Sequence, residues 1–209
     1  MDRRFLSFRL TILFIAGDRG GSQHSQIQIP REFDSIQNAL RACAHRDAIS
    51  LATPILAATF QKLVEAYRYR PGILHFAGHG DDRSISFISD RGLLVTETPL
   101  VADRIASILA NFPERVRLCV LNTCNSKSVA ERLVKAHATE AAIGWPSKVR
   151  DSEAISFSAT FYGCLGDGVP LEKSIVLASQ SFDSNNTPVL FTGDGIDRNV
   201  AYFIQETEK

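Results

Sequence analysis

The chain of 209 residues has the length of one globular domain, with 44% hydrophobic and 22% charged residues. This composition excludes a disordered tail, a collagen-like fibre and a small scaffold that needs disulfides or metals to fold. The 23 Lys and Arg residues balance the 23 Asp and Glu residues, so no overall electrostatic field favours nucleic acid or an anionic membrane as a partner.

The four cysteines, Cys43, Cys119, Cys124 and Cys164, lie in apolar or structured stretches, and no two of them form a C-x-x-C pair. A chain of this size does not need disulfides, and the cysteine spacing makes a closed zinc site a weak interpretation. Arg9 interrupts the N-terminal apolar run that would otherwise suggest a secretory signal, and no apolar stretch reaches the length of a membrane span. We therefore expect free thiols, no metal, no membrane and a reducing, cytoplasmic location.

Short apolar runs rich in β-branched residues alternate with longer amphipathic stretches along the chain, which predicts βαβ units around a mostly parallel sheet. In chain order we expect a strand at 10–15, a helix at 31–43, a strand at 49–51, a helix at 54–67, a strand at 73–77, a β-hairpin at 84–95, a helix at 100–109, a strand at 116–121, a helix at 129–137, a strand at 141–145, helices at 151–165 and 171–182, and strands at 189–191 and 200–204. The hairpin is expected to turn at Asp90-Arg91-Gly92 and to lie on the edge of the sheet. The predicted fold is one α/β domain over residues 1–209, a three-layer α/β/α sandwich.

Two of the predicted strands end in residues with unusual chemistry. His79 stands between Gly78 and Gly80, which let the backbone turn sharply and leave the Gly80 N–H free to face a ligand. Cys124 opens the loop before a helix, where the helix dipole favours a thiolate. Because loops at the carboxyl ends of parallel strands converge on one crevice, we expect His79 and Cys124 to meet there. A histidine beside a thiol is the arrangement that nucleophilic catalysis by cysteine needs. His75, inside its strand, is expected to be a core or supporting residue.

The segments His75-Phe76-Ala77-Gly78-His79-Gly80 and Leu121-Asn122-Thr123-Cys124 resemble the two signatures of the CHAT family of caspase-like cysteine peptidases. Cys124 follows His79 by 45 residues, close to the separation of about 50 in caspases. The resemblance covers residues 10–178 and includes the stretches 142–145 and 151–169. Residues 122–126 depart from the Gln-Ala-Cys-Arg-Gly type of animal caspases, so aspartate specificity is not carried over.

The resemblance implies a caspase-haemoglobinase-like fold, in a clan that includes caspases, separase and gingipains. It implies that Cys124 is the nucleophile and His79 the general acid. The backbone N–H groups of Gly80 and Cys124 would form the oxyanion hole. The reaction would pass through a thioester acyl-enzyme without a metal or cofactor.

The segment from Trp145 to Asp151 resembles the part of separase- and gingipain-like peptidases in which an acidic residue lines the pocket for an arginine. Trp145 and Asp151 are therefore the expected substrate-binding residues. A carboxylate there favours the bidentate guanidinium group of arginine over the ammonium group of lysine. We expect cleavage after Arg, less often after Lys. An alternative role for Asp151 is the N-cap of the following helix.

The resemblance also suggests biological partners. We expect a protein substrate, a role in bacterial immunity or programmed cell death, and a separate activator or sensor protein, with no nucleic acid or membrane partner and an undetermined oligomeric state. Cleavage of the chain's own loop at Lys148 or Arg150 is a second route to activation. Two alternatives stay open: a catalytically silent caspase-like interaction module, and a nucleotide-binding α/β domain that uses the loop at 17–21.

Overall fold

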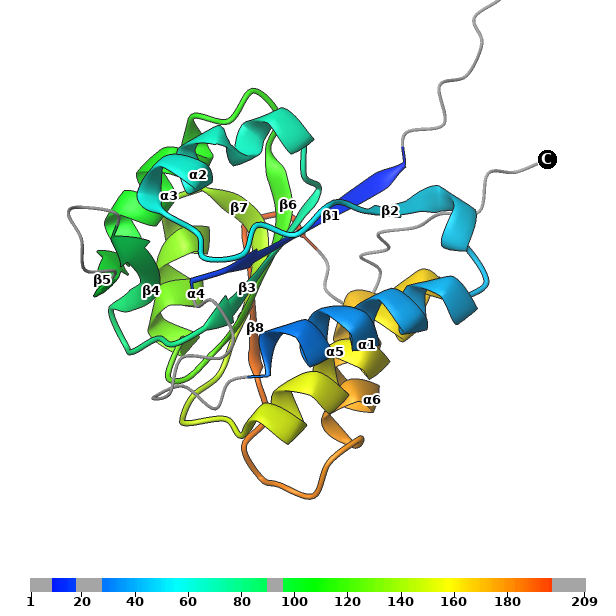
Figure 1. The fold of residues 1–209 in the computed structure, drawn as a ribbon. Coiled ribbons are helices and arrows are strands. Elements are labelled where there is room, and N and C mark those ends of the chain that lie inside the picture. Colours follow the sequence, from blue (N-terminus) through cyan, green and yellow to red (C-terminus); the bar gives the residue numbers. More distant parts are fainter. Residues whose placement is uncertain (1–8, 18–27, 90–95, 197–209) are drawn as a thin grey trace, which may run out of the picture.

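A computed structural model describes residues 9–17, 28–89 and 96–196, with residues 96–98 described by their backbone alone. Its centre is a six-stranded sheet in the order β2-β1-β3-β6-β7-β8 (Figure 1). The strands are β1 (Leu10–Ala16), β2 (Ile49–Leu51), β3 (Ile73–Gly78), β6 (Val116–Thr123), β7 (Thr139–Gly144) and β8 (Val189–Thr192). The first five strands in the sheet order run parallel, and β8 pairs antiparallel with β7. The mostly parallel sheet expected from the sequence is confirmed.

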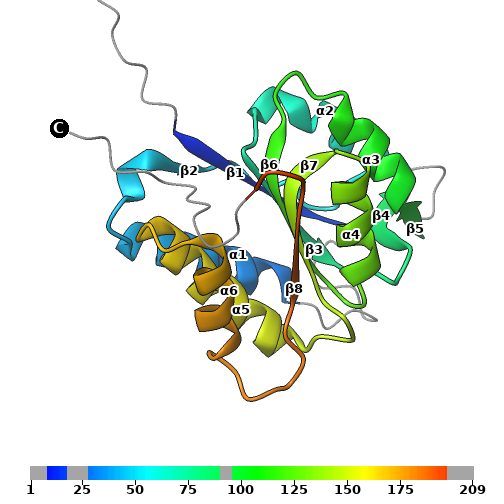
Figure 2. The same ribbon diagram turned by 180° about the vertical axis from the view of Figure 1, so that it is seen from behind.

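Helices cover both faces of this sheet, as Figures 1 and 2 show from opposite sides. One helical layer consists of α1 (Ile29–Ala42), α5 (Asp151–Gly166) and α6 (Leu171–Ser179). The other layer consists of α2 (Phe60–Glu65), α3 (Ala102–Ala110) and α4 (Lys127–Lys135). Two short 3₁₀ turns, Arg46–Ala48 and Ala66–Tyr69, join elements at the sheet edge and after α2. The three-layer α/β/α sandwich is confirmed.

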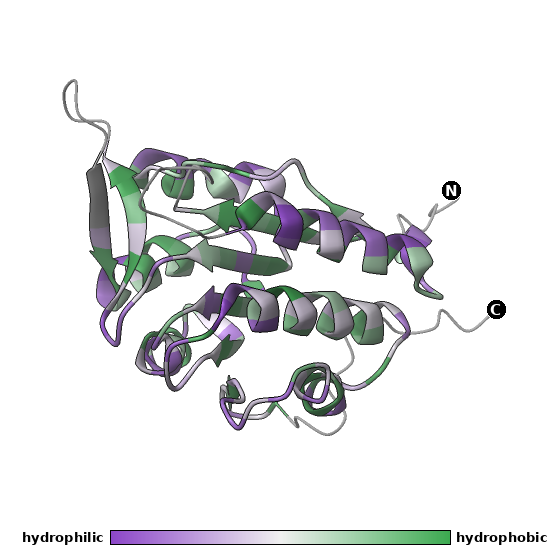
Figure 3. Ribbon diagram, turned by 60° about the horizontal axis from the view of Figure 1, so that its bottom comes forward, coloured by the Kyte–Doolittle hydropathy of each residue, from purple (hydrophilic) through white to green (hydrophobic). Residues whose placement is uncertain are grey.

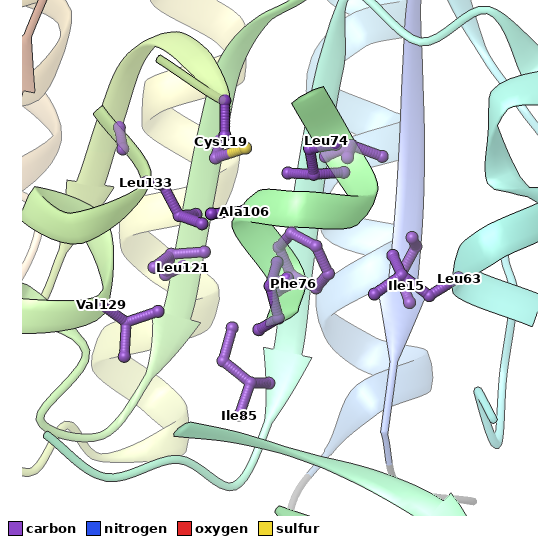
Figure 4. Close-up of a cluster of buried hydrophobic side chains, with 14 of the residues drawn as sticks. Ile15, Leu63, Leu74, Phe76, Ile85, Ala106, Cys119, Leu121, Val129 and Leu133 are labelled. Atoms are coloured by element: carbon purple, nitrogen blue, oxygen red, sulfur yellow. The ribbon is translucent and has the colours of Figure 1, made fainter. Parts of the chain in front are cut away.

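The central strands are mostly apolar because both of their faces are covered. In β1, Ile12 and Phe14 pack into the core on the side of α1 and α5, whereas Leu13 and Ile15 pack into the core on the side of α2 and α3. Figure 3 shows the apolar strands between the two helical layers, and Figure 4 shows Ile15 in the second of these cores. This alternation follows from the two-residue period of a β-strand.

The helix expected at 54–67 begins later, at Phe60. Residues before it continue alongside β1: Ile55 donates from its N–H to Phe14 O, and Ala16 donates back to Ile55 O, both at 2.9 Å. These backbone bonds replace the helical ones that residues 54–58 would have made. Thr59 then caps the helix by accepting a hydrogen bond from the Lys62 N–H at 3.3 Å.

The hairpin strands β4 (Ser84–Ser89) and β5 (Thr96–Val101) form a separate two-stranded antiparallel sheet. The expected place on the edge of the main sheet is therefore wrong, because β2 and β8 hold the two edges. The strand β5 also takes the residues just before α3, which begins at Ala102 rather than at Leu100. The predicted turn at 90–92 and the strand at 200–204 lie outside the described residues. In the part of the chain that is described, no helix has the length and apolar character needed to cross a membrane.

Candidate active site

The adjacent parallel strands β3 and β6 bring the two candidate catalytic residues to one place. Gly78, the last residue of β3, pairs with Thr123, the last residue of β6. His79 and Cys124 are the next residues along each strand, and both line a cavity of about 490 Å³. A cavity of this size lies in the range of small-ligand sites. The structure thus places His79 and Cys124 together at the carboxyl edge of the sheet.

Cys124 is a half-buried free thiol. Its Sγ donates at 3.7 Å to the carbonyl oxygen of Val149, a residue of the β7–α5 connection that also lines the cavity. The next residue, Asn125, has a positive φ of 54°, and its N–H donates to Ser147 O at 3.0 Å. The helix α4 starts soon after, at Lys127, so Cys124 stands in the loop just before the N-terminus of this helix.

The loop that carries His79 approaches the loop of Cys124 closely. A Cβ atom at Gly80 would lie 2.7 Å from the Thr123 Oγ1 atom, so a side chain at this position would displace one of the two loops. The His79 carbonyl accepts a hydrogen bond from the Ser86 N–H at 3.0 Å, which fixes the loop to β4. Among the described residues, the Gly80 N–H has no hydrogen-bond partner. This N–H group is available to an oxyanion, as the resemblance implies.

A buried polar cluster that the sequence analysis missed lies beneath the cavity. His75 is completely buried and stacks on Phe14, with ring centroids 4.9 Å apart. Its Nε2 atom lies 2.9 Å from the Glu32 Oε1 atom, and its Nδ1 atom lies 3.1 Å from the Tyr162 hydroxyl oxygen. Burial, assisted by the nearby Glu32 carboxylate, raises the pKa of Tyr162 well above its usual range, so the hydroxyl keeps its proton. The expected core role of His75 is confirmed.

Asn122 connects this cluster to the strand of Cys124. Its Nδ2 group donates to Glu32 Oε1, to Ser158 Oγ at 3.0 Å and to Ala154 O at 3.1 Å. Its Oδ1 atom accepts a hydrogen bond from the Trp145 indole Nε1 at 2.7 Å. Asn122 also lines the cavity. Asn122 stands two residues before Cys124. Its amide therefore connects β6 to helices α1 and α5 and to the end of β7.

The sequence holds a signal for Glu32. The buried residues of α1 are Ile29, Glu32, Ile36 and Leu40, which occupy one face at helical spacing. A carboxylate among three aliphatic side chains on that face indicates a buried polar partner, here the His75 ring. No comparable signal exists for Asn122, because its partners come from segments far away in the sequence.

Of the two expected substrate-binding residues, only Asp151 lines the cavity. Trp145 is completely buried, packs edge to face on Phe157 and donates to Asn122. The substrate-binding role expected for Trp145 is therefore wrong, because its indole has no surface in the cavity. Asp151 is the first residue of α5, and its Oδ2 atom accepts a hydrogen bond from the Gln28 N–H at 2.9 Å.

The N-cap of α5 is Arg150 rather than Asp151, so the alternative role of Asp151 is also wrong. The Arg150 N–H donates to Glu153 Oε2 at 3.1 Å. Within the described residues, no group of three or more His, Cys, Asp and Glu side chains is arranged to hold a metal ion. The loop at 17–21, considered above for a nucleotide, lies mostly outside the described residues. Its first residue, Gly17, packs directly against the Ser86 carbonyl.

No protein-family model matches the chain. In sequence, the chain is 28% identical over 113 residues to a Roc-COR-CHAT protease of Runella zeae. The match covers 54% of this chain and 12% of that relative, so the chain corresponds to a small part of the larger protein.

Solved structures show the same fold at low sequence identity. A secreted C11 cysteine protease from Bacteroides thetaiotaomicron, solved with an irreversible peptide inhibitor, has a TM-score of 0.56 at 10% identity and matches 91% of this chain and 63% of its own. An inactive zymogen C11 protease from Parabacteroides distasonis has a TM-score of 0.57 at 13% identity, with 88% and 61% covered. The Drosophila initiator caspase Dronc has a TM-score of 0.50 at 9% identity, with 89% and 80% covered. The chain therefore has the caspase-like cysteine-peptidase fold, and its resemblance to CHAT proteases is confirmed.

Proposed function

We propose that the chain is a cysteine endopeptidase that uses Cys124 as nucleophile and His79 as proton carrier. The observation that carries the proposal is that both side chains line one cavity immediately after the paired ends of adjacent strands. The protease fold and the likeness to a named CHAT protease support it. A base or acid within reach of a partly exposed thiol is the arrangement that covalent catalysis by cysteine requires.

The proposed reaction has two steps. The Cys124 thiol gives its proton to His79, and the resulting thiolate attacks the peptide carbonyl carbon, while the N–H groups of Gly80 and Cys124 hold the oxyanion. As the C–N bond breaks, the His79 imidazolium gives its proton to the leaving amine. Water then gives a proton to His79 and attacks the thioester carbon; the C–S bond breaks, His79 returns the proton to the sulfur, and the new carboxylic acid loses its proton to solvent.

In its resting state the thiol donates to the Val149 carbonyl rather than to His79. A sulfur–oxygen distance of 3.7 Å marks a weak hydrogen bond, and substrate entry would replace it. Catalytic hydrogen bonds are often absent or long before substrate binds. We therefore assign the dyad from the shared cavity rather than from a direct contact.

The proposed specificity is cleavage after Arg, less often after Lys. Asp151 supports it, because this carboxylate lines the same cavity as the thiol and is fixed by the N–H of Gln28. A guanidinium group offers the two parallel donors that a carboxylate accepts best. We further propose a protein substrate, a separate activator and a role in bacterial defence or programmed cell death, all supported by the CHAT resemblance.

The test is a peptide library scanned for cleavage by the wild-type chain and by Cys124→Ala. We expect cleavage after basic residues that disappears in Cys124→Ala, and a covalent adduct on Cys124 with an arginyl chloromethyl ketone peptide. A matched control is Cys164→Ala, which removes another half-buried thiol outside the cavity and should leave cleavage intact. Cleavage that persists in Cys124→Ala would refute the assignment of the nucleophile.

A further inference from the structure

Glu32 combines deep burial with access to the candidate active site. Its residue surface is only 4% exposed, yet it lines the cavity that contains Cys124 and Asp151. It stands on α1, whereas Asp151 begins α5. The bond from Gln28 N–H to Asp151 Oδ2 fixes the starts of these two helices to each other, so the cavity has a carboxylate from each helix.

The two oxygens of Glu32 have different surroundings. Oε1 accepts hydrogen bonds from His75 Nε2 and Ser158 Oγ, both at 2.9 Å, and from Asn122 Nδ2. Oε2 accepts no hydrogen bond from the described residues. The fully buried side-chain atoms that lack a partner in this part of the chain are Thr123 Oγ1 and Ser179 Oγ, so Oε2 is not sealed in the core. One oxygen is therefore fixed in the core, and the other is available to a ligand in the cavity.

The charge of Glu32 also lacks a strong cationic partner in the described part of the chain. His75 is the one ionisable group within ion-pair distance, and no Lys or Arg side chain reaches the carboxylate. A buried carboxylate is stable when it is hydrogen-bonded and paired with a cation. The three donors on Oε1 supply the hydrogen bonds, while Oε2 leaves a place for a cationic group.

From this arrangement we infer that Glu32 is a second specificity-determining residue, whose Oε2 binds the guanidinium group of the substrate arginine together with Asp151. This inference rests on the proposed function and extends it from one carboxylate to two. A guanidinium group has five N–H donors in a planar fork, enough for two carboxylates. An ammonium group is a single point charge, so the pair of carboxylates favours Arg over Lys.

Arg150 also lines the cavity and has the charge that the subsite would bind. Its side chain is 82% exposed, and its NH1 group lies 3.9 Å from Glu153 Oε1, on the first turn of its own helix. Arg150 thus leaves Glu32 and Asp151 free for the substrate.

The test uses two ligands of equal shape that differ in charge: acetyl-arginine methylamide and acetyl-citrulline methylamide. Their affinities are measured by calorimetry or NMR titration, which need no turnover, for wild type, Glu32→Gln and Asp151→Asn. Glu32→Gln keeps an oxygen acceptor for the three donors and removes the charge. We expect wild type to prefer the arginine ligand about 10- to 100-fold, and Glu32→Gln to lose about 10-fold or more of that preference.

The variant Tyr162→Phe is the matched control, because it removes the hydroxyl that bonds His75 without altering either carboxylate. We expect it to unfold at a lower temperature and to keep the ligand preference of the wild type. Asp151→Asn gives a second arm that leaves Glu32 intact. A remaining preference for arginine in Asp151→Asn supports the inference, and equal affinity for both ligands in that variant would overturn it.

The outcomes separate this inference from the proposed function. One outcome is that arginyl and citrullyl chloromethyl ketone peptides modify Cys124 of the wild type at the same rate. That result would support the peptidase assignment and refute the proposed role of Glu32. If the wild type binds the arginine ligand selectively but no peptide ketone modifies Cys124, the charge-selective subsite stands and the peptidase assignment falls. Unchanged selectivity in a folded Glu32→Gln also overturns the role of Glu32.

Discussion

Asn122 and Glu32 lie 90 residues apart in the sequence and are joined by a hydrogen bond from the Asn122 amide to the Glu32 carboxylate. Asn122 is on the strand that leads to Cys124, and Glu32 is on the helix that begins beside Asp151. The bond therefore joins the part of the site proposed to react with the substrate to the part proposed to select it.

Replacing Asn122 should destabilise the protein through this connection. Asn122→Ala leaves the Trp145 indole N–H without its acceptor and takes one donor from the buried Glu32 carboxylate. We expect the free energy of unfolding to fall by about 2–3 kcal/mol, measured by urea denaturation. Asn111→Ala is the control, because it removes an exposed bond to Ser107 O and should change stability by about 0.5 kcal/mol or less. Equal losses in both variants would contradict the importance of the cluster.

Gly80→Ala should impair catalysis because its Cβ would meet Thr123 Oγ1 at 2.7 Å. The shift moves the Gly80 N–H away from the proposed oxyanion position, so kcat/KM should fall by about 10- to 100-fold. Gly163→Ala is the control: among the described residues its Cβ would meet only Ala39 Cβ, at 3.9 Å, and alanine favours the helix α5. Full activity in Gly80→Ala would argue against the close fit of the two loops.

The four thiols should differ in reactivity. Burial raises the pKa of Cys119 to about 12, and burial also raises the pKa values of Cys43 and Cys164. A raised pKa lowers the thiolate fraction at any pH below it, and the thiolate is the reactive form. We expect iodoacetamide at pH 7.5 to modify Cys124 first, as read by peptide mass spectrometry. Faster modification of Cys43 or Cys164 at that pH would contradict this order.

Trp145→Phe should affect stability rather than substrate selection. Phenylalanine keeps an aromatic ring against Phe157 but removes the N–H that bonds Asn122 Oδ1. We expect a loss of about 1–3 kcal/mol in the free energy of unfolding. The ratio of kcat/KM values for arginyl and citrullyl peptides should stay that of the wild type. A changed ratio would return Trp145 to a direct role in substrate binding.

The connection between β7 and α5 should be the site of any activating cut. Lys148 and Arg150 are exposed there, and the Lys148 carbonyl accepts a hydrogen bond from Asn186 Nδ2 at 2.8 Å. A protease with basic specificity would recognise both residues. We expect intact-mass analysis to show cleavage after one of them on activation, and none in Lys148→Gln/Arg150→Gln. Activation of that double variant at the wild-type rate would exclude this segment.

Much of the fold is predictable because a buried parallel strand is a continuous apolar run. The strand β2 matches its expected bounds, and β1 and β3 each extend one residue further. The late start of α2 is not predictable from spacing, because residues 54–58 form backbone bonds with β1 instead. Ile55 pairs with Ile15, which lies 40 residues earlier in the sequence, and this pairing prevents the helix that the spacing of residues 54–58 predicts.

The candidate site was also predictable only in part from the sequence. The positions of His79 and Cys124 follow from strand ends, a local feature, and the structure brings both to one cavity. Their chemical roles stay predictions. The roles of Asn122 and Trp145 depend on hydrogen bonds between distant segments, which no spacing rule contains. Trp145 was assigned to the substrate through resemblance, whereas its burial places it in the supporting structure.

The backbone of His79 is bound to Ser86 of the small β4–β5 sheet, whereas Asn125, beside Cys124, is bound to Ser147 of the β7–α5 connection. Outside the paired strands β3 and β6, the proposed proton carrier and the proposed nucleophile therefore have different backbone neighbours. A change in the small sheet would act first on the loop of His79, and a change at the β7–α5 connection would act first on the loop of Cys124. Because Gly80 lies close to Thr123, either change would also reach the other loop. The alignment of the proposed pair therefore depends on two parts of the fold outside the central sheet, and a partner could act on either of them.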